Sequence, residues 1–270
     1  MILPKNKEVI IMKYYVVDAF AQKVFEGNPA GVCIMKEWLP DETMQKIAIE
    51  NNLSETAFAV KEEDSYRLRW FTPGKEVDLC GHATLATAYV IANYYEKNID
   101  KIKFQTISGE LIVVKKGDLY EMNFPSRMPE PFSLTEQMIE ALGVKPLKAY
   151  LGRDLMFVLE NEEDVQKASP DFSKLEKLPD GMGVLITAKG KKYDFVSRCF
   201  FPKIKVNEDP VCGSAHCNFI PYWAKYLGKD EMIARQLSNR GGTLYCKYCG
   251  DRVTISGSAA LYSIADIKIN

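Results

Sequence analysis

Two Cys-Gly pairs, about half the chain apart, constrain this sequence more than any other feature. One lies in Asp78–Ala83 and the other in Asp209–Ala215, and each stands directly before an apolar segment. Superposing Cys80 on Cys212 also aligns the following glycines and several alanines farther along the chain. This pattern indicates an internal duplication in which a cysteine precedes a buried helix in each half.

A cysteine at the start of a helix lies beside backbone N–H groups that have no partner within the helix. Those groups and the positive end of the helix dipole favour a thiolate and attract an anion. We therefore expect Cys80 and Cys212 to face one another across a cleft, with the backbone N–H groups of Gly81 and Gly213 holding a carboxylate. There the two thiols could act as acid and base; the alternative is that both are buried packing residues.

Glu55 and His82 are further candidates for proton transfer in the first half. Glu55 stands in a short apolar stretch where a helix gives way to a strand, so it is either a general acid/base or an ordinary solvated carboxylate. His82 directly follows the first Cys-Gly pair and is placed to meet a substrate at the helix start. The spacings of Cys80, His82 and Cys212 match no common zinc pattern, and no dinucleotide fingerprint is present. We therefore predict neither a metal nor a cofactor.

Composition argues against several classes of partner. The net charge is −1, basic and acidic residues are mixed along the chain, and no apolar run is long enough to cross a bilayer. We therefore expect no nucleic-acid or membrane partner.

Seven cysteines without a secretion signal indicate reduced thiols in a cytoplasmic protein, and Cys246-x-x-Cys249 is a weak candidate for a redox pair. Lys7–Val9 can be encoded by a stretch resembling a ribosome-binding site, so we expect Met12 to be the start.

The strand and helix patterns predict an α+β fold in two halves. In the first half, 12–124, strand-like segments surround a helix from His82 to Tyr95 that is apolar on nearly all sides. The second half, 125–261, repeats this plan around a second helix. The three prolines of Pro125–Pro131 should exclude regular structure and mark a linker between the halves.

Several longer motifs resemble the phenazine-biosynthesis PhzF-like family, and the match extends from Met12 onwards in the same order. The motifs are Asp18–Phe20, Gly27–Val32, Asn52–Phe58, Phe71–Pro73, Cys80–Ala86, Glu208–Cys217 and Ser238–Gly242. The resemblance implies a fold similar to diaminopimelate epimerase, with two pseudo-symmetric halves and the site between them. Each half would be a curled, mostly antiparallel, barrel-like sheet around a central helix, and the C-terminal strand, 262–270, would complete the first half.

The resemblance also implies roles for individual residues. In the phenazine isomerase of this family, a glutamate moves a proton between carbons of a ring substrate without a cofactor, and that glutamate matches Glu55. The residues that bind the substrate and assist the transfer match His82, Asp209 and Ser214. On this basis we expect the chemistry at Glu55, with the other three residues positioning and polarising the substrate.

The cysteines of the two Cys-Gly pairs distinguish this sequence from the phenazine isomerase, which has no cysteine at these positions. Cys80 and Cys212 instead match the catalytic thiol pair of diaminopimelate epimerases and proline racemases. Our hypothesis is a cofactor-independent isomerase that moves a proton on a small carboxylate-containing metabolite, with Glu55 as acid/base. The alternatives are a two-thiol racemase or epimerase of an amino or hydroxy acid, and a non-enzymatic binder of small anions. Relatives of this kind often dimerise, so a homodimer is also an open expectation.

Overall fold

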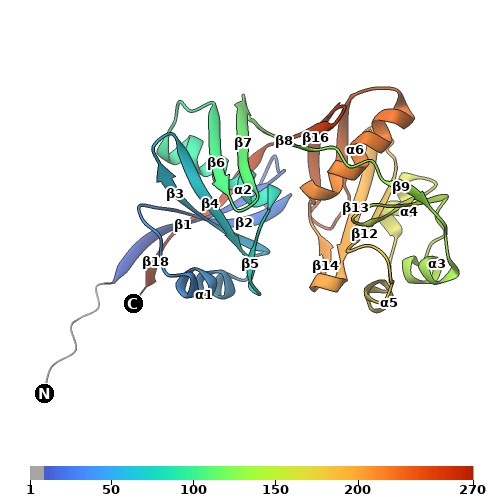
Figure 1. Cartoon of the computed structure of the whole chain (residues 1–270), viewed down its shortest axis with the longest axis horizontal. Helices are drawn as coiled ribbons and strands as arrows, with labels where there is room; N and C mark the ends of the chain where they lie inside the picture. Colours follow the sequence, from blue (N-terminus) through green and yellow to red (C-terminus); the bar gives the residue numbers. More distant parts are fainter. Residues whose placement is uncertain (1–8, 270) are drawn as a thin grey trace, which may run out of the picture.

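The computed structural model describes residues 9–269 and has two lobes that lie side by side (Figure 1). The elements of the N-terminal lobe, in chain order, are β1 (Ile10–Ala19), β2 (Asn28–Met35), α1 (Asp41–Asn51), β3 (Glu55–Glu62), β4 (Ser65–Phe71), β5 (Glu76–Val77), α2 (Gly81–Val90), a π-helical turn (Ile91–Tyr95), β6 (Lys101–Thr106), β7 (Gly109–Lys116) and β8 (Leu119–Pro125). The final strand of the chain, β18 (Ala259–Ile269), returns to this lobe and pairs with β1.

The elements of the C-terminal lobe follow the same plan. They are β9 (Glu130–Phe132), α3 (Glu136–Leu142), β10 (Lys148–Leu151), β11 (Leu155–Val158), α4 (Glu162–Lys167), α5 (Phe172–Glu176), β12 (Val184–Lys189), β13 (Phe195–Phe201), a 3₁₀ turn (Pro202–Ile204), β14 (Val206–Asp209), α6 (Gly213–Leu227), β15 (Glu231–Gln236), β16 (Gly242–Cys249) and β17 (Arg252–Gly257).

Strand pairing repeats between the lobes. In the first, β2 pairs parallel with β3, β3 antiparallel with β4, and β4 parallel with β6. In the second, the corresponding pairs are β11 with β12, β12 with β13, and β13 with β15, in the same three senses. A central helix precedes β6 in one lobe and β15 in the other. The predicted α+β fold with two pseudo-symmetric halves is therefore confirmed.

The first central helix is surrounded by sheet, as its apolar sequence predicted. Every residue of α2 except Gly81 and Tyr89 is buried, and the helix packs against β1, β2, β3 and β8. The predicted helix to Tyr95 is not α-helical throughout, because the chain widens into a π-helical turn closed by a hydrogen bond from Glu96 N to Ile91 O. In the other lobe α6 packs against β15, β16 and β17, and α2 and α6 also contact each other.

The sheet is continuous between the lobes, because β8 pairs with β7 on one side and with β17 on the other. The prediction that Pro125–Pro131 excludes regular structure is wrong at both ends. Pro125 ends β8 opposite Arg252, and Pro131 lies in β9 opposite Tyr150. Proline is tolerated at the end of a strand and at a sheet edge, where its missing N–H is not needed. The boundary between residues 124 and 125 stays a prediction.

An ion pair joins the lobes beside the start of β2. The Arg240 guanidinium, in the loop between β15 and β16, lies 2.7 Å from Asp18 Oδ1 and donates to the Gly27 carbonyl at 2.9 Å. The Gly27 N–H in turn donates to the carbonyl of Gly241 at 2.7 Å. The turn directly before Asn28 is therefore held by the C-terminal lobe.

Residues 1–8, and with them most of the segment before the expected start at Met12, lie outside the described residues, so that expectation stays a prediction. Strand β1 begins at Ile10. Among the helices within residues 9–269, none combines the length and the apolar character needed to span a membrane.

Candidate active site

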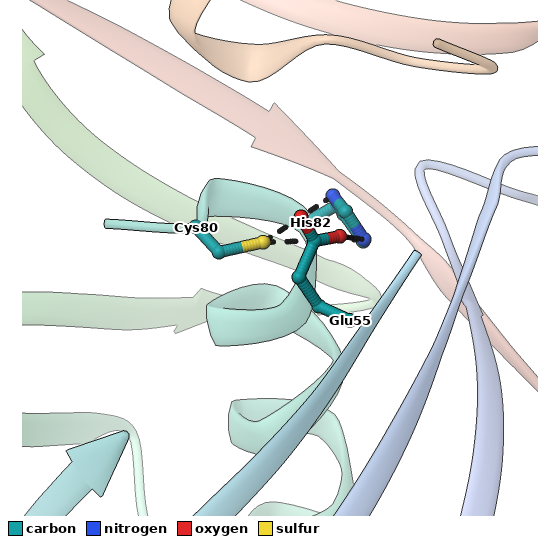
Figure 2. Close-up of side chains that lie close together, drawn as sticks. All are labelled: Glu55, Cys80 and His82. Carbon is teal, nitrogen blue, oxygen red and sulfur yellow. Dashed lines mark hydrogen bonds and ion pairs between the residues drawn. The ribbon is translucent and has the colours of Figure 1, made fainter. Parts of the chain in front are cut away.

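Glu55, Cys80 and His82 come together where β3 and α2 begin (Figure 2). Glu55 is the first residue of β3, and Cys80 is the N-cap of α2 in an extended conformation. His82 lies in the first turn of α2. The sequence therefore brings a carboxylate from a strand start and two side chains from a helix start to one place.

The three side chains are in direct contact. His82 Nε2 lies 3.1 Å from Glu55 Oε2, and Cys80 Sγ lies 3.5 Å from His82 Nδ1. The Cys80 and His82 residues are each 7% exposed, whereas the Glu55 side chain keeps 18% of its surface accessible. Glu55 is therefore the member of the cluster that can both reach solvent and exchange a proton with His82.

At Cys80, burial opposes the thiolate that a helix start favours. Burial, with a further contribution from the negative charge of Glu55, raises the pKa of the Cys80 thiol to about 11. Burial alone would lower the pKa of His82, but Cys80 and Glu55 outweigh it and raise that pKa well above its usual value. The two groups are coupled, because the contact with Cys80 that raises the pKa of His82 also acts to lower the pKa of Cys80.

The second Cys-Gly pair is arranged around Asp209 and Gln236. Asp209 ends β14, and Cys212 is the N-cap of α6. Gln236 Oε1 accepts the Cys212 N–H at 2.9 Å, while Gln236 Nε2 donates to the Asp209 carbonyl. Cys212 Sγ lies 3.3 Å from Ser214 Oγ. Burial raises the pKa of Asp209, although the nearby His82 acts to lower it. Gln236 was not identified from the sequence.

Asn28 connects the two groups across the lobes. Its side chain is fully buried, and Nδ2 donates to Asp209 Oδ1 at 2.8 Å and to the Val211 carbonyl at 3.1 Å. The same nitrogen lies 3.3 Å from His82 Nδ1. A chain of polar contacts therefore runs from Glu55 through His82 and Asn28 to Asp209. In the sequence analysis, Asn28 was only part of a family motif and had no role assigned to it.

Both predicted carboxylate-binding glycines face open space. A Cβ added at Gly213 would meet no atom within 4 Å, and one at Gly81 would meet only the Phe124 ring at 3.8 Å. Neither residue has the positive φ that would require glycine for conformational reasons. Space beside these two residues is what an anion-binding site at the starts of α2 and α6 would require.

Arg153 adds a positive charge beside Ser214 and was also missed. It lies in the turn between β10 and β11, where Nε and Nη2 donate to Asp154 Oδ2 at 3.0 and 2.8 Å. Nη2 also donates to Ser214 Oγ at 3.1 Å. The Asp154 side chain is fully buried and fixes this arrangement, while the Arg153 side chain stays 35% exposed. Nothing in the local sequence of this turn indicated a role, because the contact depends on how the lobe folds.

The weak redox hypothesis is not supported. Cys246 and Cys249 both lie within β16. Side chains three positions apart in a strand point to opposite faces, and accordingly Cys246 is buried and Cys249 is exposed. All seven cysteines are free thiols. A reversible disulfide between these two residues would require the strand to rearrange.

Comparison with known proteins agrees with this architecture. The profile of the family described as "Phenazine biosynthesis-like protein" matches residues 17–264. An uncharacterised isomerase of Pseudomonas aeruginosa is 50% identical over 246 residues, which cover 91% of this chain and 95% of that protein. The crystal structure of a PhzF-family protein from Enterococcus faecalis superposes with a TM-score of 0.95 at 54% identity, covering 96% of this chain and 99% of that one.

The fold is also shared beyond the family. A predicted epimerase of Pseudomonas aeruginosa has a TM-score of 0.71 at 19% identity and covers 95% of this chain and 99% of that one. The two lobes and paired helix starts thus define the class of proteins with the diaminopimelate epimerase-like fold. Within that class, this chain belongs to the PhzF (phenazine biosynthesis-like) family.

Proposed function

We propose that the protein is a cofactor-independent isomerase that moves a proton on a small carboxylate-containing metabolite, with Glu55 as the general acid/base. The contact between Glu55 and His82, beside a helix start that opens onto free space, carries this proposal. Three curated relatives from two bacteria are named as isomerases, which supports the reaction class. The substrate itself is left open by these names.

In the proposed reaction the substrate carboxylate binds the backbone N–H groups at Gly81 and Gly213, with Ser214 beside it. Glu55 removes a proton from the neighbouring carbon and returns it to a different position, so the composition of the substrate does not change. Negative charge develops on the substrate during this step, and a positively charged His82 stabilises it. Asp209 polarises the substrate from the other lobe, positioned by its hydrogen bond with Asn28.

The two-thiol racemase is the alternative function. A deuterium-exchange assay distinguishes it from the Glu55 isomerase. Small carboxylic acids that raise the melting temperature are incubated with the protein in D₂O, and deuterium uptake is followed by mass spectrometry. On our proposal Cys80→Ser and Cys212→Ser each keep uptake within about tenfold of wild type, because Glu55 carries the proton and the raised pKa of Cys80 keeps its thiol protonated. Near-complete loss in both variants would favour the racemase. Binding of acids without any uptake, even in the wild type, would favour the anion binder.

Gly213→Ala should lower the affinity for the carboxylate while leaving stability intact. The added methyl group meets no protein atom within 4 Å, so the free energy of unfolding should change by less than about 1 kcal/mol. In the complex it would occupy the space that the carboxylate needs at the helix start. Losing a charged hydrogen bond costs about 1.5–3 kcal/mol, so KM should rise about tenfold or more. Melting temperature and KM, measured together, check this; an unchanged KM would place the carboxylate elsewhere.

Arg153→Lys should raise KM about tenfold with little change in kcat. Lysine keeps the positive charge but cannot contact Asp154 and Ser214 together as the planar guanidinium does. Arg69→Lys is the matched control, since Arg69 also makes a bidentate contact, with the Glu76 carboxylate in the other lobe. An equal rise of KM in both variants would mean that Arg153 acts only through stability.

A further inference from the structure

We propose that Glu55, Cys80 and His82 form a binding site for Zn²⁺, and that zinc bound there blocks proton transfer. Their donor atoms lie within 4.8 Å of one another, which makes the cluster a candidate cation site. Carboxylate, thiolate and imidazole are the three ligand types that zinc accepts. Figure 2 shows the three side chains directed toward a common point from β3 and from the start of α2.

The distances are close to those of a tetrahedral site. Zinc bonds of about 2.0–2.3 Å place neighbouring ligand atoms roughly 3.3–3.6 Å apart. His82 Nε2 lies 3.1 Å from Glu55 Oε2 and 4.0 Å from Cys80 Sγ. The Glu55 oxygen and Cys80 Sγ lie within 4.8 Å of each other, so shifts of about an ångström in these side chains would suffice to hold the ion. Three protein ligands leave a fourth position for water.

Two buried oxygens beside the cluster have no hydrogen-bond partner. Glu55 Oε2 lies near His82 Nε2 without hydrogen-bond geometry, and Asn28 Oδ1 likewise accepts no hydrogen bond from the described residues. Buried acceptors of this kind are uncommon, because leaving them unpaired costs free energy. A cation bound at Glu55 would satisfy the first, and a water molecule on the ion could donate to the second.

The charges also balance. The Glu55 carboxylate and a Cys80 thiolate carry two negative charges, which the divalent ion neutralises, while His82 binds as neutral imidazole. The Cys80 thiol and the protonated His82 imidazole must each lose a proton to bulk water on binding, so binding should tighten as the pH rises. Glu55 is the most exposed of the three side chains, and the ion would enter from its side.

The inhibitory effect rests on the proposed function, whereas the binding does not. Zinc would occupy the oxygen of Glu55 and the nitrogen of His82 that proton transfer uses. Inhibition would then be competitive with substrate and reversed by a chelator. This makes free zinc a regulator of the isomerase rather than a cofactor for it.

Titration with Co²⁺, a spectroscopic substitute for zinc, tests the site without any substrate. EDTA-treated, desalted protein should develop a near-ultraviolet thiolate-to-cobalt absorption band, which added Zn²⁺ removes. Cys80→Ser should abolish the band, and Cys249→Ser, which alters the one exposed thiol, should keep it. Glu55→Gln should keep the band but weaken cobalt binding by about tenfold or more, the scale of effect seen even for residues outside the ligand set.

Two results would overturn the proposal: no band in the wild type at saturating Co²⁺, or a band that survives Cys80→Ser and disappears in Cys249→Ser. If Cys80→Ser fails to fold, as judged by circular dichroism, an unchanged cobalt affinity in Glu55→Gln overturns it equally. The zinc effect on deuterium uptake is then measured separately. A cobalt band in a protein that never exchanges protons would mean that the metal site stands and the isomerase proposal fails.

Discussion

Glu55→Gln is expected to slow deuterium uptake into the substrate by about 10²- to 10⁴-fold, the contribution typical of a general acid/base. Glutamine keeps the size of the side chain and an oxygen near His82, but it cannot accept and return a proton. The Glu55 side chain is 18% exposed, and His82, unlike an arginine, can release its proton once the carboxylate is gone, so the exchange should be tolerated structurally. The melting temperature should therefore stay near that of the wild type while uptake is lost.

Glu62→Gln is the matched control for this experiment. Glu62 lies at the opposite end of the same strand, is exposed, and pairs with Arg67 at 3.3 Å. It should leave deuterium uptake unchanged, because a surface ion pair contributes little to stability and Glu62 lies far along the strand from His82. Uptake that persists in Glu55→Gln and disappears in Cys80→Ser would transfer the chemistry to the thiols.

The architecture was predictable because the sequence carries its own duplication. Cys80 and Cys212 were expected to precede two central helices, and each is the N-cap of one. The apolar character of 82–95 predicted a helix enclosed by strands, and the sheet around α2 agrees with that prediction. Periodicity and turn residues report local structure, and these features are local.

The connections across the site were not predictable from local patterns. Asn28 and Asp209 are 181 residues apart, and Arg153 meets Ser214 across 61 residues. A single sequence does not indicate such pairs, since the local pattern around each of these residues is typical of an ordinary turn or strand end. Glu55 and His82 were candidates from their positions beside a strand start and a Cys-Gly pair, the family resemblance implied their roles, and the structure adds their direct contact.

Cys80 shows how burial competes with a helix start. The helix dipole and the free N–H groups favour a thiolate, and on that basis we expected an activated thiol. Cys80 is 7% exposed and borders the Glu55 carboxylate, and both effects favour the neutral thiol. Whether the helix start or burial has the larger effect on the thiol pKa depends on the folded environment, because the Cys-Gly-His motif does not predict the degree of burial.

Arg240→Met should destabilise the protein by about 3 kcal/mol. The Asp18 side chain is 3% exposed, and without the guanidinium its carboxylate keeps only the N–H of Phe25 as a partner. Removing one member of a buried ion pair costs about 3–5 kcal/mol, and the lower end applies because Arg240 itself is 31% exposed. Chemical denaturation and a melting temperature lowered by about 6 °C would check this.

Two further variants separate the ion pair from general disturbance of the loop. Lys13→Met removes an exposed pair with Asp266, in which both side chains are 53% exposed, and should cost less than about 1 kcal/mol. Asp18→Asn combined with Arg240→Met also removes the buried carboxylate that the single variant leaves unpaired. The double variant should therefore recover part of the lost free energy of unfolding. Because Arg240 also binds the Gly27 carbonyl directly before Asn28, the single variant should weaken substrate binding as well. Wild-type stability in Arg240→Met would mean that the lobes are held together by the continuous sheet alone.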